Sequence, residues 1–119
     1  MDVINLEKKL NSFLDYWSPK IIAELNNQQV KLAKLKGEFT WHKHDNEDEM
    51  FLVLKGVLKI AFRDKIVELN PNEILVVPKG VEHKPIAEDE VSVLLFEPSS
   101  IINTGAITND FTKSNLEKI

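Results

Sequence analysis

Residues 41–56 of the chain read Trp-His-Lys-His-Asp-Asn-Glu-Asp-Glu-Met-Phe-Leu-Val-Leu-Lys-Gly. His42 and His44 stand two positions apart, so on a β-strand, where side chains alternate between faces, both imidazoles point to the same side. The polar residues 45–48 predict a turn, and Glu49 opens an apolar run that predicts the next strand. The carboxylate of Glu49 can therefore arrive beside the two imidazoles, where the three groups would bind a metal ion.

The third and last histidine, His83, ends a second short pattern, Pro78-Lys79-Gly80-Val81-Glu82-His83, in which a turn precedes another strand. A His-x-His pair taken alone is more often two solvated or hydrogen-bonded imidazoles than a metal site. The addition of Glu49 and His83 favours metal binding, and we predict the ligands His42, His44, Glu49 and His83. Glu47 is the alternative carboxylate, but its neighbours in the acidic turn indicate a solvated loop.

A site of three imidazoles and one carboxylate offers mixed nitrogen and oxygen ligands. Such a set suits a divalent transition metal, namely Fe, Mn, Ni, Co or Zn, better than calcium or magnesium, and ligand type alone does not choose among the five. Four protein ligands on an octahedral ion leave two positions for water, dioxygen or a bidentate substrate. The predicted site therefore has room for chemistry on a small molecule.

These two patterns resemble the paired motifs of the cupin superfamily. His42-x-His44-x4-Glu49-x6-Gly56 is similar to the first motif and Pro78-x-Gly80-x2-His83 is similar to the second, and the resemblance covers about residues 30–98. It implies an all-β fold, a double-stranded β-helix of the cupin or jelly-roll type, with the four ligands inside the barrel.

The chain departs from the family pattern at three positions outside the ligand set. Gly37 stands one residue closer to His42 than the usual leading glycine, Asn72 replaces a glycine, and Ala87 replaces an asparagine. Asn adopts the left-handed backbone conformation more readily than most residues, so the exchange at Asn72 is mild.

The order of apolar and polar residues predicts a short N-terminal helix followed by many short strands. Residues 3–17 carry apolar side chains at helical spacing, and Pro19 ends that segment. We expect strands at residues 29–36, 38–44, 49–55, 57–62, 65–69, 73–77, 83–86 and 91–96, separated by turn signals. The chain then divides into an N-terminal helical segment (1–27), a β-barrel (28–98) and a C-terminal tail (99–119), which either frays or docks through Leu116 and Ile119.

Several predicted strands are apolar on both faces, so both faces need cover. The barrel interior covers one face, and the N-terminal helix or a second subunit covers the other, from which we predict a homodimer. Which subunit the helix packs against is open.

Length and composition set the remaining limits. The chain has 119 residues, a net charge of −4 and no cysteine, which predicts one domain without disulfides or metal thiolates. No basic cluster tracks a phosphate backbone, and no apolar run approaches the ~20 residues that span a bilayer. We expect no nucleic-acid partner, no membrane partner and a cytoplasmic location.

The resemblance implies a metal-dependent enzyme acting on a small molecule, of an oxygenase-like or a sugar-isomerase-like kind. The alternative is a non-catalytic module that binds a small ligand or sugar and uses its metal for structure, because the sequence offers no further acid or base near the motifs. Phe51, Val53, Phe62 and Phe96 are candidates for pocket walls or plain core. Phe39 and Trp41 alternate with His42 and are expected to face away from the site.

Overall fold

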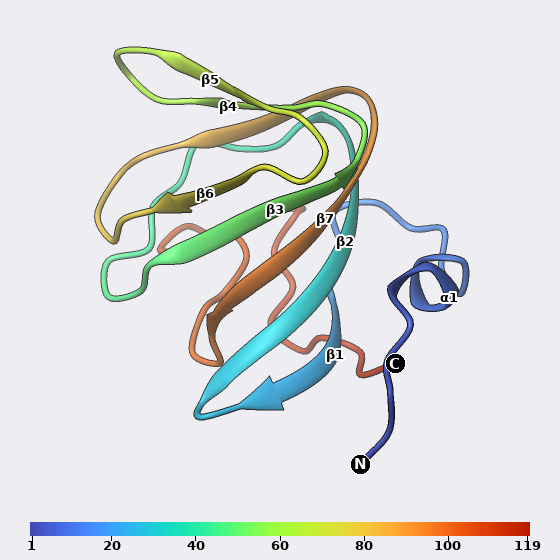
Figure 1. Cartoon of the computed structure of the whole chain (residues 1–119). Coiled ribbons are helices and arrows are strands. Elements are labelled where there is room, and N and C mark those ends of the chain that lie inside the picture. The colour runs from blue at the N-terminus through green and yellow to red at the C-terminus, as the bar shows by residue number, and fades with distance from the viewer.

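The computed structural model describes residues 1–119 and consists of one short helix and seven strands (Figure 1). In chain order, the elements are α1 (Leu6–Leu10), β1 (Lys20–Leu25), β2 (Gln28–Glu38), β3 (Glu49–Lys55), β4 (Leu58–Ala61), β5 (Ile66–Leu69), β6 (Ile74–Val77) and β7 (Lys84–Pro98). All strand pairs are antiparallel, and this confirms the predicted all-β fold with a short N-terminal helix.

The long strand β7 organises the sheet. The strand order is β1-β2-β7-β3-β6, while β4 pairs with both β5 and the first residues of β7. The register between β2 and β7 shifts after Leu35, where the pairing resumes at Gly37. This shift and those in the β1–β2 and β3–β7 pairs let the sheet curl around a core of buried, mostly aliphatic side chains. Most of these side chains come from β2, β3, β4 and β7.

The strands predicted from alternation are largely present, with β3 at its predicted bounds. Two expectations are wrong. Residues 38–44 do not form a strand, because β2 ends at Glu38 and only His42 makes a single bridge, to His83. Residues 83–86 and 91–96 are parts of one strand, β7. The structure also contains β1, an edge strand on β2 that is not predicted from the sequence.

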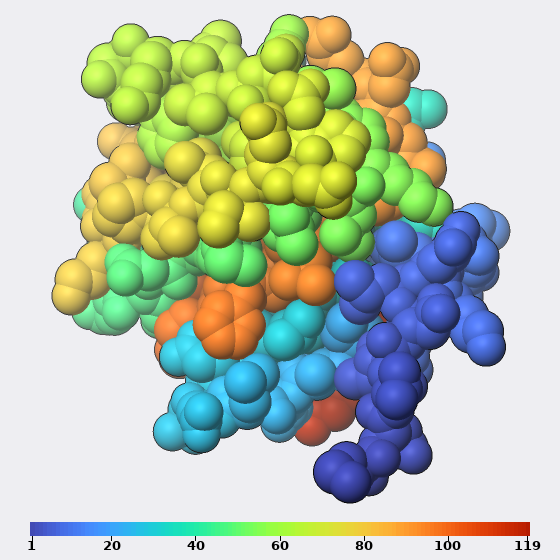
Figure 2. Space-filling view, in the orientation of Figure 1, coloured from blue at the N-terminus to red at the C-terminus, as the bar shows by residue number.

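The N-terminal helix is shorter than its pattern predicts. Asn5 caps α1 by accepting a hydrogen bond from the Lys8 backbone N–H, and Ser12 ends the helix by donating both its N–H and its hydroxyl to the Lys9 carbonyl. Leu10 packs with Phe13 on the outer face of the sheet of its own chain. Figure 2 shows this segment, in blue, along one flank of the barrel. The helix therefore covers its own subunit, and the homodimer stays a prediction.

The C-terminal segment, residues 99–119, docks on the barrel rather than fraying. Ile101 and Thr104 are buried, and the Thr104 hydroxyl bonds the carbonyl of Ile107 and the hydroxyl of Thr112. The end of the chain returns to β1, where the Ile119 N–H donates to the carbonyl of Ile21. No helix of the structure has the length and apolarity needed to cross a membrane.

Candidate metal centre

Two segments from distant parts of the chain carry the four predicted ligands. His42 and His44 lie in the irregular stretch after β2, Glu49 is the first residue of β3, and His83 immediately precedes β7. His42 and His83 exchange two backbone hydrogen bonds of 3.0 and 2.9 Å. The N–H of Gly80 donates to the His44 carbonyl at 2.7 Å, and this third bond ties the two motifs together.

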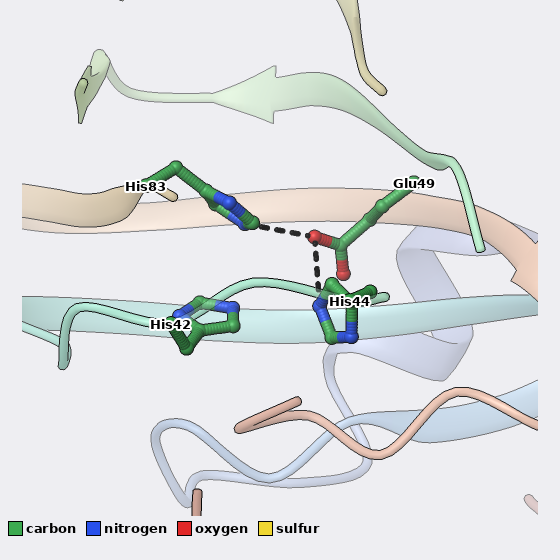
Figure 3. Close-up of side chains that lie close together, drawn as sticks. All are labelled: His42, His44, Glu49 and His83. Atoms are coloured by element: carbon green, nitrogen blue, oxygen red, sulfur yellow. Dashed lines mark hydrogen bonds and ion pairs between the residues drawn. The ribbon is translucent and has the colours of Figure 1, made fainter. Parts of the chain in front are cut away.

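The four side chains converge inside the barrel (Figure 3). One candidate ligand atom from each lies within 4.8 Å of those of the others, and all four residues are buried. Glu49 Oε1 lies 3.3 Å from His83 Nε2 and 3.6 Å from His44 Nε2. Glu47, the alternative carboxylate, lies outside this cluster and accepts a hydrogen bond from the Ser100 hydroxyl. The structure thus brings together the four residues that the sequence singles out.

Two of the imidazoles are oriented by backbone carbonyl groups. Nδ1 of His42 lies 2.9 Å from the Thr40 carbonyl oxygen, and Nδ1 of His83 lies 2.9 Å from that of Val81. A carbonyl oxygen can only accept, so Nδ1 carries the proton in both rings. In this tautomer Nε2 is the ring nitrogen that can bind a metal, which is the arrangement that metal-binding histidines use.

His44 provides the sharpest test of whether a metal fits. Both of its ring nitrogens are buried and make no hydrogen bond, because even the approach to Glu49 is too long. An unsatisfied buried polar atom costs roughly 1–3 kcal/mol. A cation bound among the four side chains would give one of these nitrogens a partner, so the residues present fit a metal ion.

The electrostatic state of the cluster also suits a cation. Burial, followed by repulsion from His83, lowers the pKa of His42 from 6.5 to about 4. Burial by itself would raise the pKa of Glu49, but the neighbouring imidazoles of His44 and His83 outweigh burial and hold that pKa well below its usual value. At neutral pH His42 is therefore neutral and Glu49 ionised, which are the forms that bind metals.

A buried ion pair, formed by Lys31 and Glu97, lies near Glu49. The Lys31 Nζ is 2.7 Å from Glu97 Oε1, and both side chains are almost inaccessible. Burial, with the neighbouring charge of Glu49, raises the pKa of Glu97 well above its usual value. Oε2 of Glu97 is buried and has no hydrogen-bond partner.

Neither Lys31 nor Glu97 is among the site residues predicted from the sequence, although a signal for them exists. Glu97 continues the alternation of the inward-facing residues Val93 and Leu95 in β7. A charged residue on the inward face of a strand needs a partner, and Lys31 provides it from the neighbouring strand β2.

A cavity beside the cluster contains both predicted and unpredicted residues. Its volume is about 40 Å³, and it is lined by Trp17, Pro19, Ala33, Leu35, Phe39, His42, Glu49, Phe51, Pro85, Val93, Leu95 and Asn103. Of the predicted wall residues Phe51 lines the cavity, Val53 belongs to the core, and the Phe62 ring lies 6.4 Å from that of His83. Phe96 alternates with the inward-facing Leu95 and does not line it.

The prediction that Phe39 faces away from the site is wrong. Its ring meets the His42 ring edge to face at 5.3 Å and stacks on Trp17 at 4.7 Å. Strand alternation does not apply here, because the chain leaves the sheet after Glu38. Trp41 does lie away from the cavity, with the guanidinium of Arg63 over its ring at 3.9 Å.

The curled antiparallel sheet and its buried cluster of three histidines and one glutamate define a single-domain barrel with a metal-binding type of site. Residues 29–97 match the family model described as the Cupin domain, and the chain belongs to this family. The resemblance and the fold expected from the sequence are thereby confirmed.

Solved structures of relatives agree with this assignment. A cupin-2 domain protein from Shewanella frigidimarina NCIMB 400 is 50% identical, with a TM-score of 0.80 over 81% of this chain and 94% of that chain. Protein NMB1881 from Neisseria meningitidis is 34% identical, with a TM-score of 0.76 over 82% and 100% of the two chains. Hydroquinone 1,2-dioxygenase PnpCD, solved with Cd²⁺ and 4-hydroxybenzonitrile, is 12% identical at a TM-score of 0.65, covers 77% of this chain and 70% of that chain, and shares the fold alone.

A curated relative is the uncharacterized protein YdbB of Bacillus subtilis strain 168. It is 45% identical over 64 residues, which are 53% of this chain and 57% of YdbB. The match therefore spans little more than half of either protein.

Proposed function

We propose that this chain is a metal-dependent enzyme that binds one divalent transition-metal ion, Fe, Mn, Ni, Co or Zn, through His42, His44, Glu49 and His83. Its substrate is a small molecule that reaches the open coordination positions of this metal. The observation that carries the proposal is the state of His44, whose two buried ring nitrogens have no partner within a cluster of potential ligands.

The surrounding residues support this role. When bound, the metal would supply Lewis-acid or redox chemistry at the open coordination positions. The carbonyl groups of Thr40 and Val81 keep two imidazoles in the tautomer that offers Nε2. The apolar side chains beside the ligands keep bulk water away from the site.

A non-catalytic ligand-binding module is the second candidate. The observation that favours it is the lining of the cavity, where the only polar side chains besides His42 and Glu49 are Trp17, through its indole N–H, and Asn103. None of these adds an acid or base for proton transfer. Substrate turnover that is lost in a folded Glu49→Gln variant would decide for the enzyme.

Elemental analysis tests the metal site itself. Protein purified without chelators or metal-affinity resin is expected to hold about one metal equivalent, and a His44→Ala variant is expected to lose it. Glu47→Gln is the matched control for Glu49→Gln, because both remove a carboxylate of the same motif but only Glu49 belongs to the cluster. Failure of the wild-type protein to bind any of the five metals after reconstitution would overturn the proposal.

A further inference from the structure

The four predicted metal ligands are closed off from solvent in this structure. All four residues are buried, and the cavity beside His42 and Glu49 has a volume of about 40 Å³. A water molecule needs about 10–15 Å³ of such volume, whereas an apolar cavity that binds benzene measures about 150 Å³. The cavity therefore has room for water but not for a ring of that size, so a substrate reaches the ligands only when part of the structure moves.

One segment borders the ligand cluster on two sides. This segment, residues 102–116, is called the C-terminal loop below; Figure 1 shows it, in red, as chain without helix or strand. Asn103 of the loop lines the cavity beside His42 and Glu49. A cleft of about 200 Å³ lies on the other side, lined by His44, Asp45, Asn46, Glu47, Ser100, Ile102, Gly105 and Ala106. The loop is thus a wall of both spaces that adjoin the ligands.

The loop also covers the aromatic wall of the cavity. The Phe111 ring lies 4.9 Å from that of Phe39 and 6.2 Å from that of Trp17, and both of these rings line the cavity. The Asn103 amide joins the two contact points of the loop, because Nδ2 donates to the Phe111 carbonyl and Oδ1 accepts from the Lys113 N–H. Asn103 and Phe111 therefore leave the cavity together when the loop moves.

No hydrogen bond or ion pair joins residues 102–116 to the rest of the chain. Their backbone bonds run from Gly105 to Ile102, from Ile107 to Thr104 and from Thr112 to Asn109, and their side-chain bonds are internal as well. Compact surface loops that bond only to themselves are frequently functional. The loop can therefore separate from the barrel without losing a hydrogen bond.

The chain on either side of the loop is fixed to the barrel. Before it, the Ser99 N–H donates to the Asn27 carbonyl, and the Ser100 hydroxyl donates to Glu47 Oε2 at 3.1 Å. After it, the Glu117 carbonyl accepts from the Ile21 N–H. Segments without hydrogen bonds to their surroundings open at a lower free energy than the core strands do.

Packing is what holds the loop against the metal-binding motif. Thr104 is buried, and the next residue, Gly105, approaches the backbone of Lys43 so closely that a Cβ at this position would overlap the Lys43 carbonyl oxygen. Lys43 stands between His42 and His44. The tightest contact of the loop is thus made on the segment that carries two of the ligands.

We propose that the C-terminal loop is a lid on the metal centre. Its displacement from Lys43, about the fixed residues at its two ends, joins the cleft beside His44 to the cavity beside His42 and Glu49 and admits metal and substrate. The proposal rests on the proposed function, because it concerns access to the metal ligands. In the closed position described here, the lid keeps bulk water from the ligands.

A thiol placed in the cavity tests the lid in metal-free protein. The chain has no cysteine, so Ala33→Cys introduces a single thiol at the cavity wall. Val53→Cys is the matched control, because Val53 is equally buried in the same core but does not line the cavity. Under native conditions, alkylation by iodoacetamide is expected to be about tenfold faster for Ala33→Cys, since lid opening costs less than unfolding of the barrel.

Gly105→Ala is the variant that should open the lid. Its Cβ presses against Lys43, so alkylation of the Ala33→Cys protein is expected to become about tenfold faster while that of the Val53→Cys protein stays unchanged. Gly37→Ala is the control: Gly37 also has a positive φ, but no atom lies within 4 Å of its Cβ position, and any effect should be equal for the two thiols. Equal acceleration of both thiols by Gly105→Ala, or no acceleration, would overturn the proposal.

Ser100→Ala repeats the test if circular dichroism shows that Gly105→Ala does not fold. It removes the hydrogen bond to Glu47 beside the loop, and alkylation of the Ala33→Cys protein is expected to become about threefold faster. Unchanged alkylation in this folded variant would then overturn the proposal.

Metal content and metal release separate the lid from the proposed function. Gly105→Ala is expected to hold the same metal content as the wild-type protein and to release it to excess EDTA about tenfold faster. Lid-dependent alkylation in a protein that binds no metal would refute the proposed function and leave the lid standing. A full metal complement, with alkylation and release rates that Gly105→Ala does not change, would refute the lid alone.

Discussion

The metal-free protein is expected to lose stability on acidification because of His42. The pKa of this imidazole is about 4 in the folded chain, against 6.5 in a solvated histidine. Above pH 6.5 His42 is neutral in both states and has no effect on the free energy of unfolding. Between pH 6.5 and about 4 only the unfolded chain binds the proton, so acid favours unfolding; below that range both states are protonated.

The size of the effect follows from the same two pKa values. Each unit of difference is worth about 1.36 kcal/mol, and the shift from 6.5 to about 4 therefore predicts a loss of about 3 kcal/mol. A typical domain has a free energy of unfolding of about 5–15 kcal/mol, so this one side chain removes a large share of it.

Urea denaturation of chelator-treated protein, repeated from about pH 7 to about pH 4, measures this loss. His42→Asn is the comparison, because its amide can still donate to the Thr40 carbonyl but does not titrate. Glu49 and Glu97 titrate in both proteins, so their contributions largely cancel in the difference between the two curves. Parallel curves would refute the argument that the folded chain excludes a proton from His42.

Three further outcomes are expected. Adding the bound metal at about 100 times its dissociation constant should raise the free energy of unfolding by about 2.7 kcal/mol, and chelation should reverse the gain. Glu97→Leu should lower the free energy of unfolding, measured by urea denaturation, by about 3–5 kcal/mol, because it leaves Lys31 buried without its partner. The double variant with Lys31→Met should recover much of this loss. Additive losses of the two substitutions would contradict the prediction. Gly105→Ala should make the C-terminal segment more susceptible to limited proteolysis than Gly37→Ala does. Both glycines have positive φ, but of the two only Gly105 would place a Cβ against a backbone oxygen, that of Lys43. Equal cleavage of the two variants would refute the steric argument.

The ligand cluster could be predicted from the sequence because its parts are local. His42 and His44 stand two residues apart, and Glu49 begins a strand with a clear alternation of buried residues. The strand expected over 38–44 is absent, yet both imidazoles still reach the cluster, since bonds to the second motif hold that irregular segment in place.

The cavity could not be predicted, because its walls come from segments outside the barrel pattern. Trp17 belongs to an apolar series that fits a helix, but the helix ends at Leu10 and the left-handed backbone at Trp17 turns the chain toward the cavity. Asn103 lies in a polar stretch without helical or strand-like hydrophobic periodicity. Such placements depend on tertiary packing, which overrides local propensity.

The return of the chain end to β1 has a consequence for folding kinetics. The backbone groups of Ile21 bond those of Glu117 and Ile119, residues almost a full chain length away. Contacts of such high sequence separation carry a large loop-closure entropy and form slowly. We therefore expect the strands around β7 to assemble first and the bonds between β1 and the chain end to form last. Protection of the β1 amides from hydrogen exchange during refolding would report this final step.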